Sequence, residues 1–343
     1  MGIIDKRREL NRSIRKSKNI FLMAHKDLDL DALGSCIGLS TILGQKKKDC
    51  YIIIDDKNHE LGVEKVLREL EGCIKIIRSE DISRYLHPNA QKNLLIILDT
   101  NKDELVQSKD LLKKIERKVV IDHHDISKST IKNAVTIIDN EVSSACEMIT
   151  QLIEFYDVEL EPYYATVLLS GIVLDTNNFT LKTTAETFYA AYYLTSLGAS
   201  AKKVQYLLKQ DIMEYTERQK LLADIETINH RIAFTKATPY TIYRREDLAK
   251  VADTLLFFNN IEASFVIGKI GKDTVGISAR SLGNYNISKI LEKLGGGGDT
   301  YNGAAKFEKT TISKVEQMLK KEIEAQEGEK NGSNFYKRLK KSR

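Results

Sequence analysis

The first half of the chain repeats one pattern, a short apolar run followed by a segment of helical periodicity. The apolar runs are NIFLMA at 19–24, YIII at 51–54, LLIIL at 94–98 and KVVI at 118–121. Short apolar runs suit buried strands, and strands that alternate with helices predict parallel pairing. We therefore expect an α/β fold whose N-terminal domain has a parallel sheet with flanking helices.

The pattern changes toward the second half. Ser144 and Glu147 have the spacing of a capping box for a helix that runs toward Tyr156, and 162–229 is mostly helical in pattern. From Arg231 onward, the strand-like stretches RIAFTK, YTIYR, ASFVIGKI and TVGISAR surround helices expected at about 246–257 and 286–294. This mixture predicts a smaller mixed α/β domain at the C-terminus.

These patterns give a domain plan. We expect a first domain over residues 1–200, a helical connection over 201–228, a second domain over 229–325 and a disordered basic tail over 326–343. The active site is expected in the cleft between the two domains.

Positive charge is concentrated at the two ends. The net charge is +5, but residues 1–18 carry +5 and residues 330–343 carry +6, which leaves −6 on residues 19–329. A groove that follows nucleic-acid phosphates needs basic side chains on the folded body. The distribution therefore argues against duplex nucleic acid as a partner, and it suits a carboxylate-rich metal site.

The cysteines and the hydropathy bear on the compartment. Cys36, Cys50, Cys73 and Cys146 show no CxxC spacing, so they are interpreted as reduced thiols. No apolar run approaches the roughly 20 residues of a membrane span. We expect a cytoplasmic protein without a membrane segment in this chain, and a homodimer is left open.

Acidic and imidazole side chains follow the apolar runs. His25, Asp29 and Asp31 follow the first run, with Asp31 as the expected N-cap of a helix that begins at Ala32. Asp99 follows LLIIL, Asp122-His123-His124 follow KVVI, and Asp175 closes the apolar run 165–174. In an open α/β sheet the carboxyl ends of the strands converge on one crevice. These clusters are therefore expected to lie together.

Each of these residues alone has a structural explanation, because Asp at a strand end is commonly a turn former or a helix cap. Taken jointly, they favour a metal site. Carboxylates and imidazoles without thiols suit Mn²⁺ or Mg²⁺, and the ligands outnumber one octahedral shell. Two ions that share a carboxylate polarise a phosphoryl oxygen and generate hydroxide near neutral pH. Phosphoester hydrolysis is the reaction that follows.

The residues also resemble a known family. HKDLDLDALGS, LLIILDTN, VVIDHH and GIVLDTNNF resemble the four motifs of the DHH phosphoesterases. VGISARSLGNYNISKILEKLGGGGD resembles the substrate-binding part of the DHH-associated domain, so the resemblance covers residues 15–325.

The resemblance implies a role for each matching residue. His25, Asp29 and Asp99 would hold one Mn²⁺, and Asp31, Asp99, His123 and Asp175 the other, so that Asp99 bridges; Mg²⁺ is the alternative metal. His124 would contact the scissile phosphate, and Asp122 would support the histidines. The expected substrate-binding residues are Ser278, Arg280, Gly295, Gly296, Gly297, Gly298 and Asp299.

Within the family, the chain most resembles the bacterial cyclic-di-AMP phosphodiesterases. The leading hypothesis is hydrolysis of a cyclic dinucleotide, cyclic-di-AMP, to the linear pApA. The alternatives are a short-oligoribonucleotide exonuclease or adenosine 3′,5′-bisphosphate phosphatase, and a catalytically weak nucleotide-sensing module. The last is suggested by Asp299, where the family has His, and by Asp125, where relatives often carry a basic residue. The chain would be either the cytoplasmic catalytic part of a membrane-anchored protein or a stand-alone enzyme.

Overall fold

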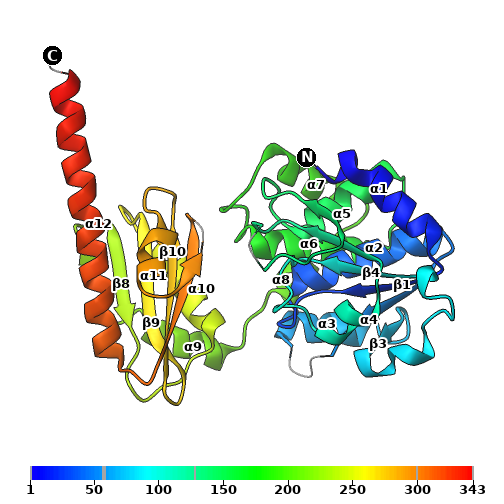
Figure 1. Cartoon of the computed structure of the whole chain (residues 1–343), viewed down its shortest axis with the longest axis horizontal. Coiled ribbons are helices and arrows are strands. Elements are labelled where there is room, and N and C mark those ends of the chain that lie inside the picture. Colours follow the sequence, from blue (N-terminus) through cyan, green and yellow to red (C-terminus); the bar gives the residue numbers. More distant parts are fainter. Residues whose placement is uncertain (1, 56–58, 127–128, 299, 342–343) are drawn as a thin grey trace. The chain divides into compact units, whose positions relative to one another are not determined.

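The computed structural model describes residues 2–55, 59–126, 129–298 and 300–341, with side chains described up to residue 326. The chain divides into two compact units, Met1–Lys209 and Gln210–Arg343 (Figure 1). Each unit is described by itself. None of the helices in the described part combines the length and the apolar character that crossing a membrane requires.

The first unit is built on a parallel sheet of six strands. They are β1 (Asn19–Met23), β2 (Asp49–Ile53), β3 (Ile76–Ile77), β4 (Asn93–Leu98), β5 (Lys118–Asp122) and β6 (Val135–Ile138). Their order is β3-β2-β1-β4-β5-β6, and every pairing is parallel. The predicted parallel sheet is therefore confirmed, with the two outer strands added.

Both faces of this sheet are buried, because successive side chains of a strand point to opposite faces. On β1, Ile20 and Leu22 belong to one core, and Phe21 and Met23 belong to another. The first core includes residues of α1 (Ile3–Lys16), α2 (Leu30–Gln45), α3 (Leu61–Glu69), α5 (Ala145–Phe155), α6 (Pro162–Asp175), α7 (Ala185–Ser196) and α8 (Ala201–Leu207). The second includes residues of α4 (Lys109–Lys114) and of the 3₁₀ helix η1 (Ser79–Arg84); a second 3₁₀ helix, η2 (Ala90–Lys92), precedes β4.

Two helix starts decide how the site is built. Helix α2 begins at Leu30, and its N-cap is Asp29, which accepts a hydrogen bond from Ala32 N at 2.9 Å. The expectation that Asp31 caps this helix is therefore wrong. The expected Ser144 cap of α5 is confirmed, because its side chain accepts from Glu147 N, but the Glu147 side chain accepts from Ser143 N and so does not complete the capping box.

The second unit holds a mixed sheet of six strands. They are β7 (Glu226–Ile228), β8 (Ile232–Lys236), β9 (Ala263–Gly271), β10 (Thr274–Ser281), β11 (Gly297–Gly298) and β12 (Asn302–Glu308), in the order β11-β12-β10-β9-β8-β7. Only β8 and β9 pair in parallel; the other neighbours are antiparallel. The helices are α9 (Ile212–Lys220), α10 (Arg245–Leu255), α11 (Ile287–Lys293) and α12 (Ile312–Lys341).

The structure of this unit differs in part from what the sequence predicted. The stretch 240–244 was expected to be a strand, but it forms only an isolated bridge between Ile242 and Lys269. The glycine run contributes the short strand β11 beside β12. The tail over 326–343 was expected to be disordered, whereas helix α12 continues through it as far as Lys341. The cleft between the domains stays a prediction.

Candidate metal centre

The carboxyl ends of three adjacent strands carry the expected ligands. His25 lies two residues after β1, Asp99 directly follows β4, and Asp122 is the last residue of β5. Helix α2 starts at the end of β1 and brings Asp29 and Asp31, and α6 ends at Asp175. The structure thus brings together all the residues that the sequence singled out for metal binding.

Asp99 lies between two histidines. Its Oδ2 is 3.2 Å from His25 Nε2, and its Oδ1 is 3.3 Å from His123 Nε2. The residue is buried, and its φ of 58° lies in the left-handed region, which Asp tolerates better than most residues. This backbone conformation, directly after β4, is part of what points the carboxylate between the two imidazoles.

The ligand atoms form two sets that Asp99 connects. One set is His25, Asp29 and Asp99, and the other is Asp31, His123 and Asp175, with the atoms of each set within 4.8 Å of one another. His123 Nε2 lies 3.2 Å from Asp175 Oδ2 and 3.9 Å from Asp31 Oδ2. The ligand roles themselves stay a proposal.

Helix α5 holds the most deeply buried of these carboxylates. Asp31 is fully buried, and its two oxygens accept hydrogen bonds from Ala145 N and Cys146 N, both at 2.8 Å. The carboxylate of Asp31 thus lies at the N-terminus of α5, where the helix dipole favours negative charge. Burial, and then the charges of Asp99 and Asp175, still raise the pKa of Asp31 well above its usual value.

The pKa values of the two histidines are raised as well, which favours their charged form. Burial lowers the pKa of His123, but contacts and charges of Asp175 and Asp99 outweigh it and raise that pKa well above its usual value. For His25, burial is likewise outweighed by Asp29 and Asp99, which raise its pKa. Positive charge is therefore strongly favoured among these carboxylates, and divalent cations would supply it.

Buried polar atoms without hydrogen bonds also indicate a cation site. Within the described part of the chain, neither Asp99 Oδ1 nor either ring nitrogen of His123 makes a hydrogen bond. A buried polar atom without a partner costs about 1–3 kcal/mol. Carboxylate oxygens and imidazole nitrogens are ligands of Mn²⁺ and Mg²⁺, so the donor set fits two divalent cations.

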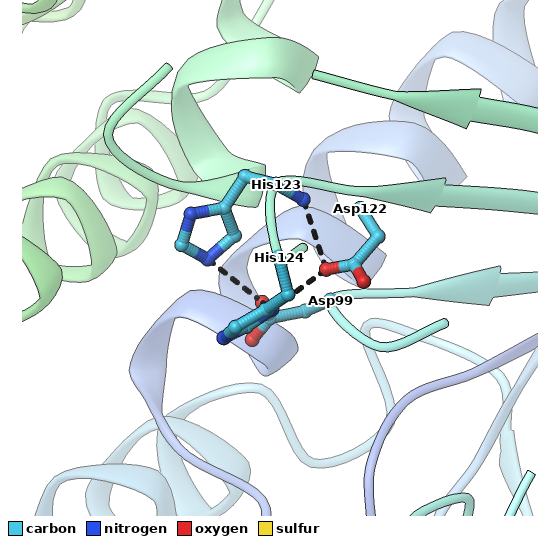
Figure 2. Close-up of side chains that lie close together, drawn as sticks. All are labelled: Asp99, Asp122, His123 and His124. Atoms are coloured by element: carbon cyan, nitrogen blue, oxygen red, sulfur yellow. Dashed lines mark hydrogen bonds and ion pairs between the residues drawn. The ribbon is translucent and has the colours of Figure 1, made fainter. Parts of the chain in front are cut away.

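Asp122 supports the two histidines that follow it (Figure 2). Its Oδ1 accepts from His123 N at 2.9 Å and lies 2.8 Å from His124 Nδ1. The contact favours the Nδ1–H form of His124, which leaves Nε2 as the nitrogen open to a ligand. The side chain of His124 is 49% exposed, whereas Asp122 is fully buried. The pair thus presents a held imidazole at the surface of the site.

Asn101 is a residue of this site that the sequence reasoning missed. Its Nδ2 donates to Asp122 Oδ2 at 2.7 Å and to the backbone carbonyls of His124 and Asp125 at 3.1 and 3.3 Å. The sequence did indicate it, because Asp99-Thr100-Asn101 directly follows a buried strand, but only Asp99 was interpreted as a site residue. Asn101 therefore fixes the turn that carries the histidines.

We expect Asn101→Ala to lower kcat by about 10- to 100-fold, the range for residues that support metal ligands. The substitution leaves Asp122 Oδ2 and two carbonyls without their donor. Hydrolysis rates and a thermal melt of the variant measure the effect. A variant with unchanged kcat would show that Asp122 and the turn hold their positions without Asn101.

The expected substrate residues lie in the second unit. Ser278 and Arg280 are two residues apart on β10 and so share one face of the sheet. Gly297 and Gly298 form β11, where a Cβ on Gly298 would lie 2.2 Å from Asn302 O. Gly295 and Gly296 precede them, and Asp299 lies outside the described residues. Strand β10 thus carries Ser278 and Arg280, strand β11 carries Gly297 and Gly298, and β12 lies between the two.

Two models of known domain families match this chain. A model described as "DHH family, N-terminal domain" matches residues 19–172, and one described as "DHHA1 domain" matches residues 232–327. The cyclic-di-AMP phosphodiesterase GdpP of Geobacillus thermodenitrificans is 36% identical over 92% of this chain and 48% of its own length. The chain thus spans about half the length of that relative.

Two further proteins share most of their length with this chain. The bifunctional oligoribonuclease and PAP phosphatase NrnA of Mycoplasma pneumoniae is 26% identical over 91% of this chain and 94% of its own length. An exopolyphosphatase-related protein from Bacteroides fragilis has a TM-score of 0.73 at 20% identity, over 92% of this chain and 95% of its own. It shows the shared fold. This chain therefore contains a DHH domain followed by a DHHA1 domain.

Proposed function

We propose that the chain is a divalent-metal-dependent phosphodiesterase that hydrolyses a cyclic dinucleotide, cyclic-di-AMP, to the linear pApA. The observation that carries the proposal is the position of Asp99 between two ligand sets. The similarity to GdpP over 92% of the chain supports the choice of substrate. A cytoplasmic location is part of the proposal, and it is supported by four cysteines that are all free thiols.

In this proposal two cations, Mn²⁺ in first place and Mg²⁺ as the alternative, are held by six side chains. His25, Asp29 and Asp99 hold one, and Asp31, His123 and Asp175, with Asp99, hold the other. Such a pair polarises a phosphoryl oxygen and lowers the pKa of a water molecule toward neutrality. The chain's own contribution is to fix these carboxylates and imidazoles in a largely buried site.

The catalytic roles in the proposal fall to His124 and its support. Asp122 holds His124 by Nδ1, so that Nε2 is available to the scissile phosphate. Asn101 in turn holds Asp122. In the second unit, Ser278 and Arg280 would bind a distal phosphate, since a guanidinium can contact two phosphate oxygens. The glycine run, Gly295 to Gly298, would let the nucleotide approach the backbone.

The second candidate is a short-oligoribonucleotide exonuclease or an adenosine 3′,5′-bisphosphate phosphatase. The similarity to NrnA over 94% of that protein's length favours it. The ligand set is the same in both candidates, so it does not distinguish them. The distinction lies in the length and the cyclisation of the substrate.

The test is one activity panel with Mn²⁺. We expect cyclic-di-AMP to be converted to pApA, with slower release of AMP from pApA and from adenosine 3′,5′-bisphosphate. Chelation by EDTA should abolish turnover, and Mn²⁺ should restore it. Turnover of pApA or the bisphosphate without turnover of cyclic-di-AMP would favour the second candidate. Binding of cyclic-di-AMP without hydrolysis of any substrate would indicate a sensing module.

A further inference from the structure

Arg280 lies against helix α10 on one face of the second sheet. It is the next-to-last residue of β10, and its Nε donates to the carboxylate of Asp253 on α10 at 2.6 Å. Strand β9 is also close to this helix, because a Cβ on its Gly268 would lie 2.8 Å from the side chain of Leu248 on α10. Gly268 pairs with Gly276 of β10, so the two glycines share this face of the sheet. Figure 1 shows α10 beside β9 and β10.

The Asp253–Arg280 pair is largely enclosed. The side chain of Asp253 is 26% exposed and that of Arg280 is 18% exposed. Burial raises the pKa of Asp253, and the charge and hydrogen bond of Arg280 oppose this shift. The residue before Asp253 connects α10 to the sheet, because Ser264 Oγ of β9 donates to Ala252 O at 2.7 Å. The carboxylate is thus held in place from its own helix.

The bonds of the guanidinium leave one nitrogen for a ligand. Nε is used by Asp253, and Nη1 donates to Ala279 O at 3.0 Å and contacts Ser278 Oγ at 3.4 Å. Among the described residues, none accepts a hydrogen bond from Nη2 of Arg280. A guanidinium is planar, so fixing Nε and Nη1 also fixes the direction of Nη2.

We propose that Asp253 is a positioning residue that holds Arg280 ready for a phosphate of the substrate. The proposal rests on the proposed function, in which Arg280 binds that phosphate. A free arginine loses rotamer freedom when it binds, whereas an arginine already held by a carboxylate does not. The negative charge of Asp253 acts in the other direction, because it weakens the attraction of the site for phosphate. The sign of the affinity change therefore tells positioning from neutralisation.

The experiment compares Asp253→Asn with the unchanged protein. We expect KM for cyclic-di-AMP to rise about 3- to 10-fold, as for one side chain that is no longer held before binding. We expect kcat to stay within about 2-fold, because the metal ligands lie in the other unit. Calorimetry with pApA should show the same rise in Kd.

Two further variants isolate the pair. In an Arg280→Ala background, Asp253→Asn should not raise KM further, because the arginine that it positions is absent. Asp247→Asn is the matched control, since Asp247 lies on the same helix and binds Arg218 at 2.9 Å instead. That control should leave KM unchanged. Asp253→Glu, which keeps a carboxylate, should recover part of the lost affinity.

The outcomes separate the two proposals. If Arg280→Ala loses affinity while Asp253→Asn binds like the unchanged protein or more tightly, the positioning role is refuted and the proposed function stands. If the unchanged protein neither binds nor hydrolyses any dinucleotide, both fall. Should Asp253→Asn melt below the assay temperature, Asp253→Glu carries the test, with KM raised about 3-fold and kcat unchanged.

Discussion

Asp99→Asn is expected to lower kcat for phosphodiester hydrolysis by about 10³-fold or more. The two oxygens of Asp99 face different histidines, at 3.2 Å and 3.3 Å, so one substitution disturbs both ligand sets. The charge stabilisation by a bound cation is worth several kcal/mol, and about 1.4 kcal/mol corresponds to a tenfold rate. Steady-state kinetics with Mn²⁺ and cyclic-di-AMP measure the loss.

Metal titration shows whether the loss has the expected cause. Calorimetry of the unchanged protein with Mn²⁺ should give two binding events, and Asp99→Asn should weaken both. Asp29→Asn should weaken one, because Asp29 belongs to a single set and Asn keeps the cap of α2. Asp103→Asn, an exposed neighbour on the same loop, should change neither. Two events of unchanged affinity in Asp99→Asn would contradict the shared-ligand geometry.

The parallel sheet and the residues at the carboxyl ends of its strands could be predicted, because both depend on the local pattern of apolar residues. Runs such as LLIIL are buried on both faces, and a parallel strand needs a helix before the next one. The residue after each run is then at the carboxyl edge whatever the helix lengths are. Asp99 and Asp122 could therefore be assigned to one edge without coordinates, and the structure places them there.

Other features depend on contacts between distant segments. Asp31 was expected to cap its own helix, but it accepts from Ala145 N and Cys146 N of α5, more than 110 residues later. Asp253 reaches Arg280 only because β9 and β10 place that arginine under α10. A sequence pattern shows that a carboxylate lies on a helix, but not which partner the packing brings to it. Strand β7 was missed because it has only three residues, two of them exposed, and β12 because its buried positions are the small residues Gly303 and Ala305.

Gly171→Ala is expected to lower both stability and activity, because it disturbs the packing of the helices that carry Asp31 and Asp175. Gly171 lies in α6, and a Cβ there would be 2.6 Å from Cys146 Sγ and 2.8 Å from Asp31 Cα. Real Cβ contacts are not this short, so α6 would have to move away from α2. Overpacking of this kind costs about 1–3 kcal/mol of unfolding free energy. Asp31 and Asp175 would separate, and a displacement of about 1 Å can lower the rate about 100-fold.

A second glycine in the same contact provides the control. A Cβ on Gly34 would be 2.7 Å from Cys146 Sγ and 3.2 Å from Val167 O, so its shortest contact is with a side chain. Cys146→Ala removes that atom and should restore most of the stability and activity of Gly34→Ala. It should not restore Gly171→Ala, because the backbone of Asp31 still blocks the methyl group. Chemical denaturation and kcat of the four variants measure both effects. Equal rescue of the two glycine variants would mean that the thiol, and not the approach of α6 to Asp31, sets the spacing of the two helices.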